Sequence, residues 1–200
     1  MAMWSNMWQN WQDGSSKCDG CPGQEAPYPL CFGNRSSDIM MVGQEPAYNV
    51  DEDRVERDMH WMEAQEQMVI DRRESMNPLW RHMMRLGLEL EMAPDDLYFT
   101  NIAKCNPGSV EHCRGYIPRE LANVNPRVLL LYGSNAIMSV FDMFDIEWSG
   151  SVTDVHLEPV DRSHLTIIPT LHWGYAMRNG TFDQYNTEVA QTVNDEYNNS

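Results

Sequence analysis

Four short runs of apolar residues alternate along the chain with longer segments whose apolar positions recur at helical spacing. The runs are 38–42, 97–101, 128–132 and 165–169. Each is almost continuously apolar, which is typical of a strand that is covered on both faces. We therefore predict four strands separated by helices.

The helical segments lie between and after these runs. Residues 77–90 begin with an Asn-Pro pair, which suits the N-cap and first turn of a helix. Further helices are predicted at 118–124, at 133–144 and from 182 towards 193. Strands that alternate with helices form parallel sheets with crossover connections. The predicted fold class is α/β, a three-layer α/β/α sandwich with a central four-stranded parallel sheet.

The length of 200 residues predicts a single domain over 1–200. Residues 1–17 form an N-terminal extension in which Met and Trp recur at helical spacing, as expected of a stripe that packs on the domain. Residues 49–75 are an acidic insertion, either an active-site flap or a solvated loop. Residues 194–200 are predicted to be a polar, frayed tail.

The net charge is −16, and the chain has twelve arginines but only two lysines, Lys17 and Lys104. This composition is typical of a protein kept soluble in concentrated salt, as in a haloarchaeal cytoplasm. The alternative is an acidic mesophilic protein from a GC-rich genome. The charge argues against simple electrostatic binding of nucleic acid. Molar salt screens the repulsion between the acidic protein and DNA phosphates. The charge therefore does not exclude a DNA substrate that is held by a shaped pocket.

Nothing in the chain predicts a membrane protein. The N-terminus has no basic start and no continuous apolar core, so a signal peptide is not expected. No apolar stretch approaches the roughly 20 residues that span a bilayer. We expect a cytoplasmic, monomeric protein in which the five cysteines do not form disulfides.

Four cysteines form two close pairs. Cys18 and Cys21 are a Cys-x-x-Cys motif in a glycine-rich turn, and Cys105 and Cys113 follow the second predicted strand. Four thiolates suit either a 4Fe-4S cluster or zinc. The alternative is that the cysteines are only buried apolar residues. Cys31 stands alone and is predicted to be a core residue.

Polar side chains follow the predicted strands at the points where they end. The first strand is followed by Gln44, Glu45 and Tyr48, the second ends with Thr100 and Asn101, and the last is followed by Thr170 and His172. Because the carboxyl ends of parallel strands meet at one edge of a sheet, a carboxylate, an amide and an imidazole are expected to share a site there.

The order of these motifs resembles the uracil-DNA glycosylase superfamily, and most closely its branch with a four-iron four-sulfur cluster. The resemblance spans roughly residues 18 to 178. Its most specific pieces are the cysteine order, "TNIAKC" (100–105), "NPRVLLLYGSNA" (125–136) and "PTLH" (169–172).

The resemblance implies roles for individual residues. Glu45 would orient the hydrolytic water and offset the developing sugar cation, Asn101 would read the flipped base, and His172 would donate to the uracil O2. Gly43 and Gln44 would complete the substrate pocket, and Trp61 or Tyr48 would stack on the base. The partner would be DNA that contains uracil or a related deaminated base.

Two positions differ from the usual pattern of that branch. The sequence "GQEPA" places the carboxylate one position further along, and Trp173 stands where a proline usually follows the histidine. The leading hypothesis is a monofunctional DNA glycosylase of base excision repair. The alternatives are a non-catalytic nucleic-acid-binding or damage-sensing relative, and a cluster-dependent redox or regulatory protein.

Overall fold

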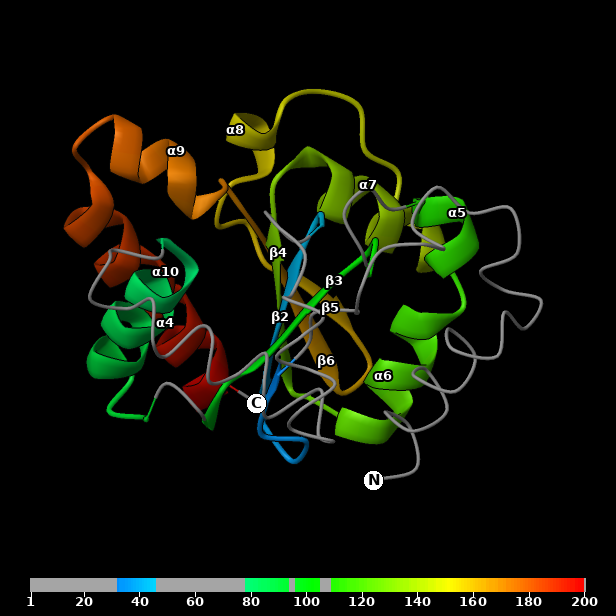
Figure 1. Ribbon diagram of the computed structural model, residues 1–200, viewed down its shortest axis with the longest axis horizontal. Helices are drawn as coiled ribbons and strands as arrows, with labels where there is room; N and C mark the ends of the chain where they lie inside the picture. The colour runs from blue at the N-terminus through cyan, green and yellow to red at the C-terminus, as the bar shows by residue number, and fades with distance from the viewer. Residues whose placement is uncertain (1–31, 46–77, 94–95, 105–108, 200) are drawn as a thin grey trace, which may run out of the picture.

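The computed structural model describes residues 32–45, 78–93, 96–104 and 109–199, and its centre is a six-stranded sheet (Figure 1). The strand order is β1-β3-β2-β4-β6-β5. The strands are β1 (Phe32–Gly33), β2 (Ile39–Gly43), β3 (Tyr98–Asn101), β4 (Val128–Tyr132), β5 (Val160–Arg162) and β6 (Leu165–Thr170). β3, β2, β4 and β6 pair in parallel, whereas β1 and β5 pair antiparallel at the two edges.

The four parallel strands are the four that the apolar runs predict, with ends that agree to within one residue. Every residue of these strands is buried. This explains why their sequences are continuously apolar rather than alternating, because helices cover both faces of the sheet. The edge strands β1 and β5 were not predicted. They are only two and three residues long.

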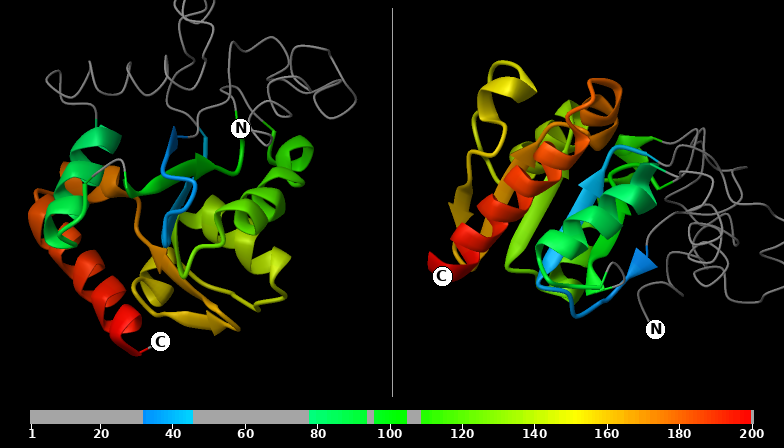
Figure 2. Two further views of the ribbon diagram at one scale, coloured as in Figure 1. Left: turned by 90° about the horizontal axis from the view of Figure 1, so that it is seen from below. Right: turned by 90° about the vertical axis from the view of Figure 1, so that its left-hand side faces the viewer.

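Helices form a layer on each face of the sheet. The described helices are α4 (Pro78–Glu89), α5 (Val110–Cys113), α6 (Tyr116–Val124), α7 (Ser134–Met143), α8 (Val152–Val155), α9 (Trp173–Arg178) and α10 (Phe182–Asn199). Figures 1 and 2 show α4, α9 and α10 together on one side of the sheet, and α6 and α7 on the other. The predicted three-layer α/β/α sandwich is therefore confirmed.

Two separate apolar clusters fill the spaces between the layers. Alternate residues of each strand point to opposite faces. Val42 and Leu131 pack with α6 and α7, while Met41 and Leu130 pack with α4, α9 and α10. The sheet thus divides the core, and each side chain near the end of a strand is assigned to one of the two faces.

The last helix is longer than predicted. α10 continues past Val193 to Asn199, so most of the segment expected to be a polar tail is helical. Its last turn is anchored to the sheet, because the guanidinium of Arg127 lies 4.1 Å from the ring centre of Tyr197 and donates to the Tyr197 carbonyl oxygen.

The extension 1–17 and the insertion 49–75 lie outside the described residues. Among the described helices, none has the length and apolar content needed to cross a bilayer.

Candidate active site

Asn101, the last residue of β3, is buried at the carboxyl edge of the sheet, with 2% of its surface exposed. It pairs in register with Gly43, the last residue of β2. A methyl group added to Gly43 would meet Oδ1 of Asn101 at 2.6 Å and the ring of Phe99 at 3.3 Å. Gly43 is therefore needed at this position because the amide of Asn101 occupies the space above it.

The Nδ2 group of Asn101 is buried and has no hydrogen-bond partner among the described residues. Leaving a buried donor unpaired costs about 1–3 kcal/mol. Such groups are rare in folded proteins and call for an explanation, for example a ligand or a catalytic role. Asn101 therefore presents a buried hydrogen-bond donor for which the described residues supply no acceptor.

Gln44 and Glu45 follow β2 and are exposed at the same edge. The Gln44 carbonyl oxygen accepts from the backbone N–H of Ala103, at 2.8 Å, which ties the end of β2 to the residues after β3. The side-chain oxygen of Gln44 accepts from Nδ2 of Asn135 at 2.7 Å, and its Nε2 lies 3.4 Å from a carboxylate oxygen of Glu45. Asn135, in the first turn of α7, thus holds the amide that lies beside the carboxylate.

His172 follows β6 and is the N-cap residue of α9. Its Nδ1 accepts from the backbone N–H of Gly174 at 3.0 Å. In the neutral ring this bond leaves the proton on Nε2. The pKa of His172 is lowered from its ordinary value because neighbouring atoms partly desolvate the exposed ring and because the positive charge of Arg178 is close. The site therefore favours a neutral imidazole that can donate from Nε2.

Two glycines, Gly43 and Gly133, lie between Asn101 and His172 along this edge of the sheet. The order across the edge is Asn101 on β3, Gly43 on β2, Gly133 after β4 and His172 after β6. Three strand spacings of about 4.8 Å separate the two outer backbones by about 14 Å. Gly133, which has a positive φ of 85°, contributes no side chain, and an added methyl there would lie 3.8 Å from Cβ of His172.

Comparison with known proteins assigns this architecture to a family. Residues 31–194 match the family model of the uracil DNA glycosylase superfamily. The chain belongs to this superfamily. It is also 33% identical over 63 residues to a curated type-4 uracil-DNA glycosylase from Archaeoglobus fulgidus. That match covers 28% of this chain and 32% of the relative, so about a third of the relative's length is matched.

The superfamily match covers all four groups that meet at this edge: Asn101, Gln44, Glu45 and His172. Of the residues predicted for the site, Tyr48 and Trp61 lie outside the described part of the chain. Asn135 was not singled out from the sequence. Its position three residues after Tyr132, the last residue of β4, is the signal that could have identified it.

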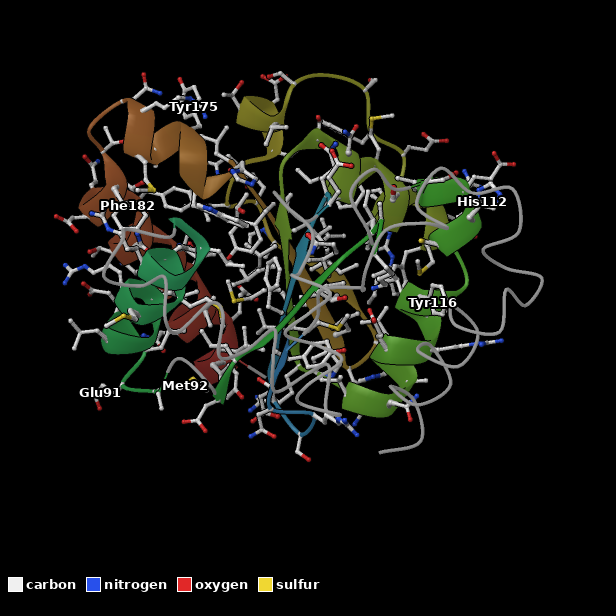
Figure 3. The ribbon with its side chains drawn as sticks, viewed as in Figure 1. Glu91, Met92, His112, Tyr116, Tyr175 and Phe182 are labelled. Atoms are coloured by element: carbon white, nitrogen blue, oxygen red, sulfur yellow. The ribbon has the colours of Figure 1, made fainter. Side chains whose placement is uncertain are left out.

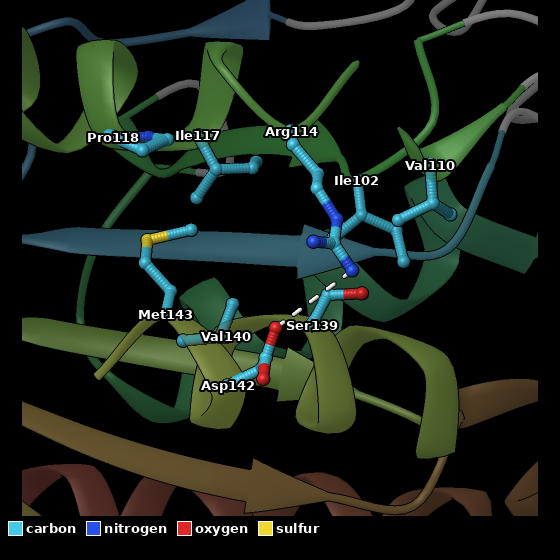
Figure 4. A pocket seen from close by; sticks show the side chains of 9 residues that line it. All are labelled: Ile102, Val110, Arg114, Ile117, Pro118, Ser139, Val140, Asp142 and Met143. Atoms are coloured by element: carbon cyan, nitrogen blue, oxygen red, sulfur yellow. Dashed lines mark ion pairs between the residues drawn. The ribbon is translucent and has the colours of Figure 1, made fainter. Parts of the chain in front are cut away.

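A cavity of about 190 Å³ lies on the α6 and α7 side of the sheet, with walls from α5, α6 and α7 (Figure 4). Its walls are mostly apolar, and Arg114 and Asp142 face one another across it at 3.9 Å. This cavity is lined by none of the candidate residues at the carboxyl edge of the sheet.

Beneath the edge, on the α6 side, lies a buried ion pair. Nζ of Lys104 is 2.7 Å from a carboxylate oxygen of Glu120 and 2.6 Å from Oγ of Thr100, and both charged side chains are almost fully buried. Burial raises the pKa of Glu120, and the nearby ammonium opposes that rise. The charge of Lys104 is thus balanced by that of Glu120.

The predicted metal ligands are only partly within the described residues. Cys113 is buried in α5, while Cys18, Cys21 and Cys105 lie outside. Within the described part of the chain, no group of three or more His, Cys, Asp or Glu side chains could hold a metal ion. A metal site that includes Cys113 would therefore need ligands from outside the described residues, and the three other predicted thiols are a donor set that fits an iron–sulfur cluster or zinc.

Proposed function

We propose that this protein hydrolyses the N-glycosidic bond of uracil, or of a related deaminated base, in DNA. The observation that carries the proposal is the buried Nδ2 donor of Asn101 at the carboxyl edge of the sheet, which has no acceptor among the described residues. Membership of the uracil DNA glycosylase superfamily supports the reaction class. The base itself and the repair role are part of the proposal.

Asn101 would recognise the base. A side-chain amide offers one donor and one acceptor in a fixed arrangement. Nδ2 would donate to O4 of uracil and Oδ1 would accept from N3–H. Cytosine carries an amino group at C4 and no proton on N3, so the same amide meets a donor with its donor and an acceptor with its acceptor. Recognition therefore follows from the polarity of one side chain.

His172 would stabilise the leaving base. As the glycosidic bond breaks, negative charge grows on the uracil ring, and Nε2–H of a neutral imidazole can donate to O2. A preorganised donor of this kind is worth about 10²–10³ in rate. The bond from Gly174 N–H to Nδ1 supports this role because it directs the proton to Nε2.

Glu45 would act on the other side of the bond. Its carboxylate would orient the attacking water and offset the positive charge that develops on the sugar. The contact chain from Asn135 through Gln44 to Glu45 supports a defined position for this carboxylate. Because duplex DNA hides the glycosidic bond, the nucleotide must leave the stack to reach these groups. Tyr48 or Trp61 would stack on the extruded base.

The ion pair of Lys104 supports the expectation of a monofunctional enzyme, which leaves the sugar–phosphate backbone intact. Backbone cleavage through a Schiff base needs an unprotonated amine near the sugar. Lys104 is buried and paired with Glu120 on the α6 side of the sheet. The other lysine, Lys17, lies outside the described residues. We expect an abasic product with no β-elimination.

Cys18, Cys21, Cys105 and Cys113 would hold a 4Fe-4S cluster, with zinc as the alternative. Such a centre would supply a structural link between the N-terminal part of the chain and the residues after β3, and it would take no part in bond cleavage. The single-domain, monomeric arrangement belongs to the same proposal.

The proposal is tested by base release from oligonucleotides that contain uracil, xanthine or hypoxanthine, single- and double-stranded, over a range of KCl concentrations. We expect release of at least one base, and a loss of rate in His172→Ala and Glu45→Gln. DNA binding without release of any of the three bases would instead favour a non-catalytic, damage-sensing relative.

A further inference from the structure

Trp173, the residue directly after His172, is the first residue of α9 and is buried, with 6% of its surface exposed. Its ring centre lies 4.0 Å from that of His172, with 31° between the two planes. His172 itself is exposed at the carboxyl edge. The imidazole therefore rests on an indole that reaches from the edge into the core.

His82 of α4 lies on Trp173 in the core. The two rings stack with centres 5.3 Å apart and planes at 10°. Tyr132 and Phe99 meet the indole edge-on, at 4.9 Å and 6.1 Å. The indole is thus held by aromatic rings from α4, β4 and β3, which leaves it little freedom to tilt.

The polar atoms of His82 are fully paired. Asn186 donates from Nδ2 to the Phe182 carbonyl oxygen, so its Oδ1 is the acceptor for Nδ1–H of His82, at 2.8 Å. Nε2 of His82 then accepts from the Tyr132 hydroxyl at 2.9 Å. Burial lowers the pKa of His82 to about 3, so the ring is neutral at ordinary pH.

The neighbouring backbone is fixed in the same region. The Tyr185 hydroxyl donates to the Leu171 carbonyl oxygen at 2.6 Å, and the Leu171 N–H donates to Nδ1 of His156 at 3.2 Å. Figure 3 marks this side of the molecule by Phe182 of α10 and by the exposed Tyr175 of α9. The residue before His172 is therefore held from two directions.

We propose that Trp173 and His82 are positioning residues: the stack His82–Trp173–His172 sets the plane of the His172 imidazole, while Gly174 sets its tautomer. The inference rests on the proposed function, because it concerns the histidine expected to act on the leaving base. An electrostatic donor contributes only when its orientation is fixed before the reaction, and a displacement of about 1 Å can cost about 10²-fold in rate. Neither Trp173 nor His82 needs to touch the substrate.

The experiment compares Trp173→Phe, which keeps an aromatic ring beside His172, with Trp173→Leu, which does not. Both remove buried volume. Phe141→Leu is the matched control, since Phe141 is a buried aromatic residue in the apolar cluster on the other face of the sheet. Two readouts are taken from the full-length protein: the nitrogen chemical shifts of the His172 ring by NMR, and the single-turnover rate and KM of base release.

In the parent we expect one His172 tautomer, with the proton on Nε2, and ring protons shifted upfield by the indole. Trp173→Phe and Phe141→Leu should keep that tautomer. Trp173→Leu should show nitrogen shifts that are averaged between tautomers and a rate of base release about 10²-fold below that of Trp173→Phe, at similar KM.

Equal nitrogen shifts and equal rates in the Leu and Phe variants would overturn the positioning role. The NMR arm separates this failure from failure of the proposed function, because it needs no turnover. If Trp173→Leu does not fold, the parent decides: averaged tautomers or unshifted ring protons of His172 in the unmodified protein would also overturn the proposal.

Discussion

Acidification from about pH 7.5 to about pH 5 should lower the free energy of unfolding by about 2 kcal/mol through His82 alone. The pKa of this histidine falls from 6.5 to about 3 in the folded protein, because the ring is buried between Trp173 and Tyr132. Below pH 6.5 the unfolded chain takes up the proton and the folded chain does not. Stability is therefore complete above pH 6.5 and is lost progressively as the pH falls towards 3.

The assay is urea unfolding at a series of pH values, for the parent and for His82→Gln. The variant lacks the titrating ring, so its stability should fall by about 2 kcal/mol less than that of the parent over this interval. The difference between the two proteins removes the contributions of other groups, such as His156 and His172. His164→Gln is the control, because His164 is exposed in the turn before β6. Parallel curves for parent and His82→Gln would refute the burial of a neutral His82.

Three further changes test other parts of the structure. Glu120→Ala leaves Lys104 buried without its partner and should cost about 3–5 kcal/mol in urea unfolding; an unchanged midpoint would contradict the buried ion pair. Gly43→Ala adds a methyl group 2.6 Å from Oδ1 of Asn101 and should slow base release about 10²-fold with little change in melting temperature; a rate equal to that of the parent would show that the amide has room to move. Cys113→Ser should yield protein with reduced metal content and visible absorbance, and full metal content would remove Cys113 from the ligand set.

The parallel core was predictable because burial on both faces leaves a clear mark on the sequence. The run 128–132 is continuously apolar, and β4 occupies the same residues, Val128–Tyr132. β5 offers no such mark, since its three residues, Val160–Arg162, are exposed or half-buried at an edge. α9 has only six residues and follows β6 after two residues, too short for a period to emerge.

The common edge of the candidate site residues was predictable from the sequence, but their contacts were not. The polar residues at the ends of β2, β3 and β6 predicted that Glu45, Asn101 and His172 lie at one edge, because parallel strands align their carboxyl ends. Sequence could not show that the Asn101 donor is buried and has no acceptor among the described residues. Nor could it show that Trp173 packs beneath His172, because that contact depends on α4 and β4, which are distant along the chain.

The central claim is that the amide of Asn101 reads a uracil held at the carboxyl edge of the sheet. The most direct test is the single-turnover rate of uracil release from an oligonucleotide by the parent, by Asn101→Ala, and by Asn123→Ala, which removes an exposed amide on α6. We predict that Asn101→Ala loses at least about 10² in rate while Asn123→Ala matches the parent. Release of uracil by Asn101→Ala at the parental rate would contradict the account.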